Sequence, residues 1–455
     1  MNLFPQKDFY KRILRVALPA IAGLSTQMVV SLVDAAMVGR LENATYALAA
    51  MGIGVLATWA LISFFSSLAT GTHVLVARRF GQQNFVECGN VLNNSLLISV
   101  IIGSLVTSVG VFFSYEVADL FSSDQNVTLY ASDYIFYRFL GIPLFLISVS
   151  YRGFYFGINK GKAFLVSGVI TNFLNVIFNY IFIFGNFGFP KMELAGAGLG
   201  STLATSFDFL FYTYILLLKR YRIKYQNFRH FKFDFEVIKS ICKISLPVSF
   251  QNLFILIGFL SFIGITGIIG TKEQAASQAV ISTLFISFLP CFGFGIAIQT
   301  LVGINLGADK LKLAKIYGFE TAKLASIYTL LLGIIFLMIP QYVLLIITND
   351  YSIIETAKSS LRIAAIAQMF YATGIVLANA LQAAGKMVYV MKTEVISNLF
   401  IFVPFAYFFG IYLEMGLIGA WLALPIYIII YSGSMLIKFS SKDWFEKLPM
   451  KNISK

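Results

Sequence analysis

VALPAIAGLSTQMVVSLVDAAMV, the stretch from Val16 to Val38, decides the fold of this chain. It is long and apolar enough to cross a bilayer, which takes about 20 mainly apolar residues. It nevertheless contains Asp34, although a carboxylate at membrane depth costs about 2.5–3.5 kcal/mol on insertion scales. The position of Asp34 therefore predicts that this residue has either a function or a partner.

The same stretch opens an internal repeat that covers both halves of the chain. ALPAIAGLSTQ at 17–27 is echoed by SLPVSFQ at 245–251, and Phe262 stands where the first copy has Asp34. Two later matches pair INKGKAFLVSGVITNFLN at 158–175 with AAGKMVYVMKTEVISNLF at 383–400, and LAGAGLGST at 194–202 with LIGAWLAL at 417–424. Halves with an even number of spans keep one orientation, so the repeat predicts two parallel bundles, a common plan of transporters.

The composition is that of a membrane protein. The 455 residues are 58% hydrophobic and 12% charged, whereas soluble domains carry about 25% charged residues. The short alternating segments of a membrane β-barrel are absent from the sequence. We therefore predict an all-α integral membrane protein with twelve transmembrane helices in two pseudo-symmetric six-helix lobes. The predicted spans are 16–38, 52–76, 91–113, 131–151, 164–184, 195–218, 244–268, 280–303, 319–346, 361–381, 393–413 and 416–437.

The charges in the links predict the orientation. Links on one side hold most of the Lys and Arg, such as Arg78, Arg79 and the run KRYRIKYQNFRHFK, whereas the other side holds acids such as Glu116. The excess of basic residues in cytoplasmic links predicts that both termini are cytoplasmic, in a plasma membrane or bacterial inner membrane. The predicted parts are an N-terminal lobe at 1–218, a basic cytoplasmic linker at 219–243, a C-terminal lobe at 244–437 and a cytoplasmic tail at 438–455.

Several function classes are excluded by what the sequence lacks. The net charge of +13 comes from basic residues in the links, so a nucleic-acid partner is not expected. The three cysteines have no metal or redox spacing, and neither a P-loop nor a catalytic triad occurs. We predict no enzyme activity, no metal and no cofactor. The first span follows its basic segment at full length, so we expect it to serve as its own insertion signal.

Asp34 is the strongest candidate for a functional residue. A carboxyl group buried in a membrane can take up a proton from outside and release it inside, and a cationic drug would compete with that proton. The alternative is an interfacial Asp with no transport role. Gln27 lies seven residues earlier, on the same helical face, and is predicted to line the same cavity.

Three amides share one face of the predicted fifth span. Asn172, Asn175 and Asn179 recur at i, i+3 and i+7, which is helical spacing. They are expected either to line a cavity beside Asp34 or to join the span to a neighbouring helix by hydrogen bonds.

Other polar residues within spans are weaker candidates. Asp208 is the second deep acid and is expected to pair with a basic residue such as Arg152; the alternative is a second acid with a role in coupling. Tyr137, Tyr151 and Tyr155 are candidates for the walls of a drug cavity, because aromatic faces attract cations.

The order of these motifs resembles a known family. LPAIAGLSTQ…LVDAAMVGR, ALAAMGIG, ARRFGQ, YRGFYFGINKGKAF and, in the second half, LPVSFQ, VGINLGA and LQAAGK are similar to the multidrug and toxic compound extrusion (MATE) family, in its DinF-like branch. The resemblance covers nearly the whole chain. It implies a two-lobe antiporter that exports organic cations or amphipathic compounds against an inward H⁺ or Na⁺ gradient.

The resemblance also implies roles for particular residues. Asp34 matches an Asp of the first lobe, Asn175 and Asn179 match an Asn and an Asp of the fifth span, and Ser201 or Thr202 matches a hydroxyl residue at the start of the sixth. The second-lobe acids of the sodium-linked branch are replaced by Leu253–Phe254–Ile255 and Tyr371. This departure favours coupling in the first lobe.

We therefore predict a secondary antiporter, monomeric, coupled to H⁺ or possibly Na⁺ through Asp34. The expected partners are the lipid bilayer and small cationic or amphipathic substrates. Two alternatives remain open. A flippase for lipid-linked saccharides would carry a basic central cavity, and a membrane scaffold without transport activity would be indifferent to substitution of Asp34.

Overall fold

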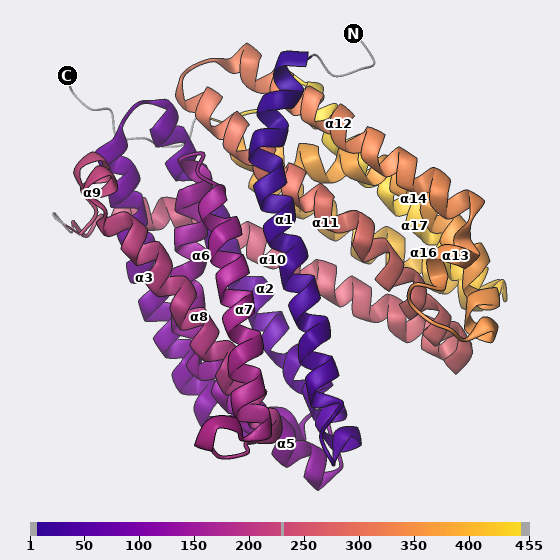
Figure 1. Cartoon of the computed structure of the whole chain (residues 1–455). Helices are drawn as coiled ribbons and strands as arrows, with labels where there is room; N and C mark the ends of the chain where they lie inside the picture. The colour runs from indigo at the N-terminus through magenta and orange to yellow at the C-terminus, as the bar shows by residue number, and fades with distance from the viewer. Residues whose placement is uncertain (1–6, 229–231, 447–455) are drawn as a thin grey trace. The chain divides into compact units, whose positions relative to one another are not determined.

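The computed structural model describes residues 7–228 and 232–446. Within these ranges all of the regular secondary structure is helical, and there is no strand. The middle of the predicted basic linker and the tail beyond Glu446 lie outside the described residues. Figure 1 shows the arrangement of the helices.

The first half of the chain forms eight helices and one short turn before the linker. They are α1 (Lys7–Val38), α2 (Ala44–Gly81), α3 (Phe85–Phe112), α4 (Ser114–Asp119), α5 (Gln125–Leu140), α6 (Ile142–Gly157), α7 (Lys162–Phe184), η1 (Asn186–Gly188) and α8 (Glu193–Leu217). A short helix, α9 (Lys219–Tyr225), lies within the predicted linker.

The second half repeats the pattern of long helices. Its elements are α10 (Phe235–Ile269), α11 (Thr271–Gly307), α12 (Leu311–Met338), α13 (Pro340–Leu344), α14 (Tyr351–Ala383), α15 (Met387–Ser397), η2 (Asn398–Phe402), α16 (Val403–Tyr407), η3 (Phe408–Tyr412) and α17 (Gly416–Ser440). The elements η2 and η3 are π-helical turns, so α15 to η3 form one membrane-length segment, Met387–Tyr412.

The described residues contain ten helices that are each long and apolar enough to cross a membrane. Two further spans arise if each of two bent pairs counts as one, α5 with α6 at 47° and α8 with α9 at 75°. The resulting twelve coincide in order with the twelve predicted spans. The bend between α5 and α6 has a local cause: Gly141 separates the helices and Pro143, in the first turn of α6, has no N–H to continue the ladder.

The chain divides into two compact units. One comprises Ala22–Ser245, and the other comprises the chain up to Ile21 together with the chain from Leu246 onward. Two helices, α1 and α10, thus begin in one unit and end in the other. Each changes unit within three residues of a proline, Pro19 in α1 and Pro247 in α10, which are the equivalent prolines of the repeat.

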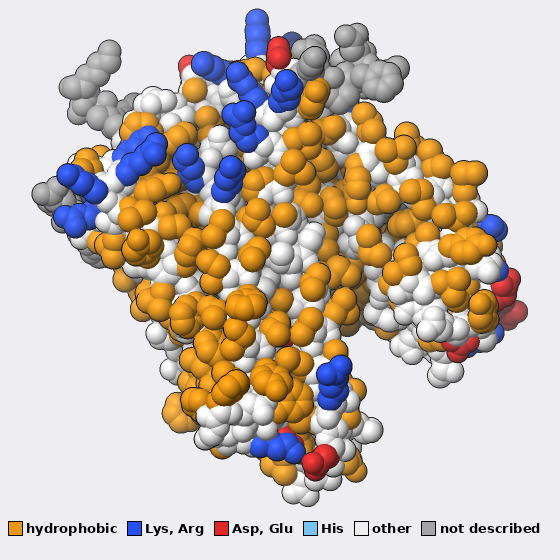
Figure 2. Space-filling model, viewed as in Figure 1, with side chains coloured by type: hydrophobic (Ala, Val, Ile, Leu, Met, Phe, Trp, Pro, Cys, Tyr) orange, Lys and Arg blue, Asp and Glu red, His pale blue; other side chains and the backbone are white. Residues whose placement is uncertain are grey.

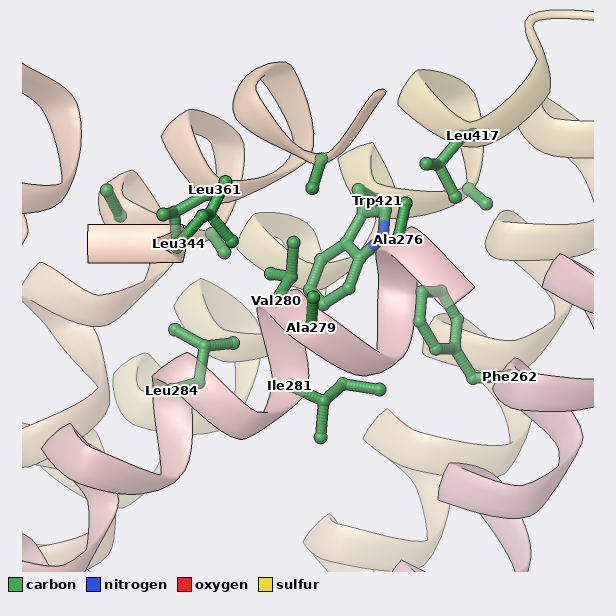
Figure 3. Packing of buried hydrophobic residues seen from close by; sticks show 14 of the residues in the cluster. Phe262, Ala276, Ala279, Val280, Ile281, Leu284, Leu344, Leu361, Leu417 and Trp421 are labelled. Carbon is green, nitrogen blue, oxygen red and sulfur yellow. The ribbon is translucent and has the colours of Figure 1, made fainter. Parts of the chain in front are cut away.

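The unit that contains the second half has a core around Phe262, the residue that replaces Asp34 in the repeat. Its ring stacks on Phe402 with centroids 5.0 Å apart and meets Trp421 edge-on at 5.1 Å. The Trp421 indole donates a 3.0 Å hydrogen bond to Ser277. Figure 3 shows Phe262 and Trp421 among the aliphatic side chains of this core. An acid at this position would lie in an apolar core.

The first-half unit is joined by buried hydroxyl groups as well as by apolar packing. Between α2, α3 and α6, the Thr72 and Ser95 hydroxyl oxygens lie 2.6 Å apart, those of Ser95 and Ser150 2.7 Å, and those of Ser99 and Ser150 2.8 Å. Small hydroxyl residues let membrane helices approach closely and bond to one another. This network therefore fixes the packing of the three helices.

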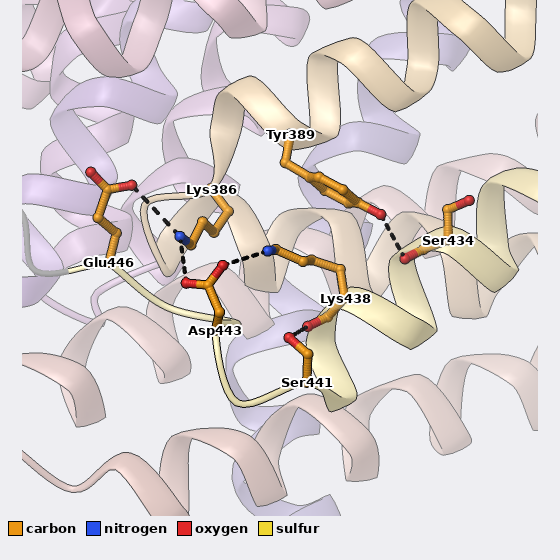
Figure 4. Close-up of polar contacts among 7 residues, drawn as sticks. All are labelled: Lys386, Tyr389, Ser434, Lys438, Ser441, Asp443 and Glu446. Carbon is orange, nitrogen blue, oxygen red and sulfur yellow. Dashed lines mark hydrogen bonds and ion pairs between the residues drawn. The ribbon is translucent and has the colours of Figure 1, made fainter.

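The segment after α17 folds back on the loop between α14 and α15. Asp443 accepts from Lys386 at 2.9 Å and from Lys438 at 2.7 Å, and Lys386 also lies 3.9 Å from Glu446 (Figure 4). The buried Trp444 ring packs against Phe439. The first residues of the predicted tail are thus bound to their own unit.

Figure 2 shows the distribution of side chains on one face of the protein. Near α9, where Lys219, Arg220, Arg222 and Lys224 are exposed, basic side chains gather. Below them the surface of the same unit is mostly hydrophobic. A hydrophobic surface bounded by basic residues at one end is expected of a protein embedded in a bilayer.

Candidate functional site

The candidate site is centred on Asp34, near the end of α1. The Asn179 side chain on α7 donates a hydrogen bond from Nδ2 to Asp34 Oδ1, 2.7 Å long. Asn179 is fully buried. An amide held beside a carboxylate in a low-dielectric interior makes a charge-assisted bond, which is stronger than a neutral one.

A polar chain leads from Asp34 across three helices. The same Asn179 Nδ2 also lies 3.3 Å from Asn175 Oδ1, and Asn175 Nδ2 donates to Ser201 Oγ on α8 at 3.1 Å. The helical spacing of the two amides and the position of Ser201 therefore bring three of the predicted site residues to Asp34, directly or through one another.

The close approach of α7 and α8 depends on a glycine. A Cβ atom at Gly200 would lie 2.3 Å from Asn179 Oδ1 and 3.1 Å from the Asn179 backbone nitrogen. The Oδ1 atom is buried and has no hydrogen-bond partner. Gly200 thus provides the space in which the Asn179 amide is oriented with its N–H group toward Asp34.

Asp34 has no ion-pair partner in the part of the chain that the structure describes, because no Lys or Arg nitrogen lies within 4.0 Å of its carboxylate. Arg138 on α5 lies within electrostatic range of it. The Arg138 Nε atom is buried without a hydrogen-bond partner. Arg138 therefore attracts the Asp34 carboxylate only at longer range, without an ion pair. The carboxylate can still bind a proton or another cation.

The remaining predicted residues of this unit lie around the polar chain or apart from it. Thr202 donates to the Tyr137 carbonyl oxygen at 2.7 Å and so joins α8 to α5 through the backbone. Asn172 has a buried Nδ2 without a partner. Gln27 is exposed on α1, and its backbone carbonyl accepts from Ser31 at 3.1 Å. None of these three side chains bonds to Asp34.

Asp208 makes the ion pair that the sequence predicts. Its Oδ2 lies 3.1 Å from Arg152 Nη2, and Ser167 donates to its Oδ1. The carboxylate is 1% exposed, and the Arg152 guanidinium lies 5.4 Å from the centre of the Phe164 ring. A buried acid with a cation and a hydroxyl donor has its charge compensated, so this pair joins α6, α7 and α8.

Tyr151 and Tyr155 are buried at the interface of α6 and α8. The Tyr151 hydroxyl lies 2.9 Å from Thr213 Oγ1, and the Tyr155 hydroxyl donates to the Tyr212 carbonyl at 2.9 Å. Tyr155 and Tyr212 stack with centroids 5.3 Å apart. Both tyrosines therefore pack against Tyr212, and neither bonds to Asp34.

In the second half, the positions that match the second-lobe acids of the sodium-linked branch hold no acid. Tyr371 on α14 stacks on Phe288 at 4.3 Å. One buried acid of this unit is Glu394 on α15, to which Tyr427 donates a 2.5 Å hydrogen bond. The burial of Glu394 could have been predicted from the apolar residues on both sides of it. Its hydrogen-bond partner, however, lies far away in the sequence. Among the described residues, no three His, Cys, Asp or Glu side chains are grouped to hold a metal.

Comparison with known proteins gives a family match in both halves. The profile described as MatE matches residues 19–181 and 247–408. The chain is 25% identical over 446 residues to the probable multidrug resistance protein NorM of Thermotoga maritima, covering 97% of this chain and 95% of that protein. It is 20% identical over 367 residues to the probable multidrug resistance protein YoeA of Bacillus subtilis, covering 80% and 79%.

Solved structures have the same fold. One is a MOP superfamily transporter from Pyrococcus furiosus, with a TM-score of 0.87 at 21% identity, covering 94% of each chain. A second is a multidrug resistance MATE family transporter in an outward-facing conformation, with a TM-score of 0.87 at 21% identity, covering 94% of this chain and 96% of that one. At these identities the likeness concerns the fold alone.

Proposed function

This chain belongs to the MatE family, and from that premise we propose that it exports organic cations and amphipathic drugs in exchange for H⁺, with Asp34 as the coupling group. Membership of the family makes it a multi-pass membrane transporter rather than an enzyme. The observation that carries the proposal is that the Asp34 carboxylate has no ion-pair partner among the described residues. Asp34 lies in a membrane-length helix, bonded to a neutral amide at 2.7 Å and without a basic partner within 4.0 Å among the described residues.

The geometry supports an exchange of cations at Asp34. In the ionised state the carboxylate accepts the Asn179 hydrogen bond and attracts a cationic drug. A proton on the carboxylate removes that attraction and releases the drug. Binding of the proton and binding of the drug then exclude one another, which is what antiport requires. The Asn175–Ser201 contact behind Asn179 keeps the amide oriented through the cycle.

Sodium is the second candidate ion. Asn175 and Ser201 supply amide and hydroxyl oxygens near Asp34, and hard cations prefer oxygen ligands. The absence of acids from Leu253–Phe254–Ile255 and from Tyr371 favours a first-lobe site for either ion.

The proposal also covers the orientation of the protein in the membrane and the lobes that move during transport. We propose a monomer in the bacterial inner membrane with both termini in the cytoplasm, consistent with the basic residues of α9. The two lobes, 1–218 and 244–437, are proposed to alternate access, with 219–243 as the linker and 438–455 as the tail. Pro19 and Pro247 interrupt the backbone ladders of α1 and α10, which would let these helices bend.

Efflux of a fluorescent organic cation tests the proposal. Cells would carry the wild type, Asp34→Asn, or the control Asp133→Asn at matched membrane levels, because Asp133 is an exposed acid on a helix of the same unit. The proton and sodium gradients are collapsed in separate runs. We expect efflux that needs the proton gradient, is lost in Asp34→Asn and is kept in Asp133→Asn.

Other outcomes would support different functions. Efflux that persists in Asp34→Asn would refute coupling at Asp34. If neither protein moves any dye, assays of lipid-linked saccharide translocation would test the flippase alternative. Indifference of every flux to Asp34 would favour a membrane scaffold.

A further inference from the structure

The second-half unit buries a glutamate that has no basic partner. Glu394 is 2% exposed and lies in the membrane-length segment Met387–Tyr412. Within residues 7–228 and 232–446, no Lys, Arg or His nitrogen lies within 4.0 Å of its carboxylate. Such a charge is costly in an apolar interior unless hydrogen bonds stabilise it or a proton neutralises it.

The groups that face the carboxylate are neutral and come from several helices. Tyr427 on α17 donates to Oε1 at 2.5 Å, and Tyr431, Asn398 and Gln251 also face the carboxylate. Tyr371 on α14 is a further titratable group within its electrostatic range. The Glu394 cluster, as we define it, consists of Glu394 with Gln251, Asn398, Tyr427 and Tyr431.

One amide of the cluster is oriented by a relay of glutamines. Gln251 Oε1 accepts from Gln382 Nε2 at 3.1 Å, and Gln382 Oε1 lies 3.4 Å from Gln299 Nε2. The Gln251 oxygen is thus used by Gln382, which leaves its N–H group for Glu394. Tyr427 donates to the carboxylate, and the buried Tyr431 hydroxyl has no hydrogen-bond partner of its own, so both are available as donors to an ionised carboxylate. A protonated carboxyl group must itself donate, so the cluster has two distinct hydrogen-bond arrangements.

Another glutamate of the same unit shows the contrast. Glu320 on α12 is also buried, but Lys323 Nζ lies 2.8 Å from its Oε1. Its charge is therefore compensated within its own helix. Glu394 has hydrogen-bond donors instead of a cation, and a change in its protonation changes the net charge of the cluster.

Two features set Glu394 apart: its position in the repeat and the π-helical turn beside it. The matching first-half helix, residues 162–184, contains no Asp or Glu, just as Phe262 replaces Asp34 in the second half. Each half therefore has, among its described residues, an acid in a membrane-length segment without a basic partner, half-buried Asp34 and buried Glu394, at positions that are not equivalent. A π-helical turn, Asn398–Phe402, begins at a member of the cluster, and π-turns within α-helices are frequent at functional sites.

We propose that Glu394 is a second proton-binding site of this protein, formed within the second-half unit and separate from Asp34. The part of the proposal that makes this proton a coupling ion rests on the proposed function; the binding of the proton does not. In the ionised state Glu394 joins α15 to α17 through the Tyr427 hydrogen bond, and protonation of the carboxylate weakens that bond. Proton uptake at Glu394 therefore changes the contact between these two helices.

Infrared difference spectroscopy of the full-length purified protein tests proton binding directly. The band of protonated carboxyl groups is followed during a pH titration of the wild type, Asp34→Asn, Glu394→Gln and the control Glu320→Gln. We expect Glu394→Gln to remove one titrating band and Asp34→Asn to remove another. Glu320→Gln should leave both bands in place. Loss of no band in folded Glu394→Gln would overturn the proposal.

Two further readouts separate binding from transport and from folding. If Glu394→Gln does not fold, Tyr427→Phe replaces it: the Glu394 band should change its midpoint because the carboxylate loses one donor, and an unchanged midpoint overturns the proposal.

In proteoliposomes, the number of protons exchanged per drug should fall in Glu394→Gln, and an unchanged ratio overturns its coupling role. Absence of drug transport in the wild type would refute the proposed function, whereas the infrared bands would still decide proton binding.

Discussion

The Asn179 amide nitrogen on α7 donates a 2.7 Å hydrogen bond to the carboxylate of Asp34 on α1, across 145 positions of the sequence. The partner of the membrane acid is therefore an amide, which cannot neutralise its charge. Asn175 and Ser201 continue the contact to α8. The chemistry of Asp34 thus depends on how three helices pack.

Asn179→Asp should change the ion dependence of efflux. Two carboxylates within hydrogen-bond distance cannot both stay ionised unless a proton or another cation lies between them. We expect efflux to become severalfold more responsive to external Na⁺, measured as dye transport at constant pH. Asn172→Asp is the matched control, because this change on the same helix adds an acid that is not bonded to Asp34. Equal responses in the two variants would contradict the prediction.

Gly200→Ala should disturb Asp34 without touching it. The new methyl group would lie 2.3 Å from Asn179 Oδ1, so α7 and α8 must separate or the amide must turn. Overpacking of this kind costs about 1–3 kcal/mol, and we expect a lower melting temperature together with slower proton-driven efflux. Gly264→Ala is the control, since nothing lies within 4 Å of a Cβ atom there. Wild-type efflux in Gly200→Ala would show that the Asn179 contact is dispensable.

The buried pair Arg152–Asp208 should be structural. Removal of one partner leaves a buried charge uncompensated, which costs about 3–5 kcal/mol. We therefore expect Asp208→Asn to lower the melting temperature of the purified protein strongly, and the double variant Asp208→Leu/Arg152→Met to recover much of that loss. The double variant should still couple efflux to the proton gradient. Uncoupled efflux in a stable double variant would instead give Asp208 a role in coupling.

The ion pairs of Asp443 should make the contact of the C-terminal segment sensitive to acid. Lys438 and Lys386 lower the pKa of Asp443 to about 2, from about 3.9 in an unfolded chain. Because the folded-state pKa is the lower one, the stabilisation is complete above about pH 4 and is lost as the pH falls toward 2. Fluorescence quenching of the buried Trp444 would follow the release.

Asp443→Asn should expose Trp444 already at neutral pH, because the amide carries no charge for the two lysines. Glu355→Gln is the control, since it removes an exposed ion pair, with Lys358, from another part of the same unit. Trp444 that stays equally protected in Asp443→Asn would show that packing against Phe439 alone holds the segment.

Phe262 should be required for the core of its unit. Phe262→Ala removes the contacts with Phe402 and Trp421 and leaves a cavity, which costs about 3–5 kcal/mol. We expect a lower melting temperature of the purified protein. Phe400→Ala is the control, because that side chain is 70% exposed and its loss should have little effect. Similar melting temperatures for the two variants would contradict the core assignment.

Much of the fold could be predicted from the sequence because membrane insertion is decided locally. Each span needs about 20 apolar residues and satisfies its own backbone hydrogen bonds. For the same reason the twelve predicted spans follow, in order, the ten membrane-length helices and two bent pairs among the described residues. The repeat of proline-containing motifs likewise indicated two related halves. The bend between α5 and α6 at Gly141 and Pro143 concerns the internal shape of one span, which hydropathy does not report.

The sequence by itself determined a polytopic helical protein, the acid Asp34 and the amide stripe Asn172, Asn175 and Asn179, because composition and helical spacing are local properties. Its prediction that Asp208 pairs with Arg152 is confirmed. Only the tertiary structure decided which of these groups meet. It placed Asn179, and not Gln27, against Asp34, and it brought the Tyr427 hydroxyl of α17 to Glu394. Such contacts depend on how whole helices pack, and the relevant positions lie far apart along the chain.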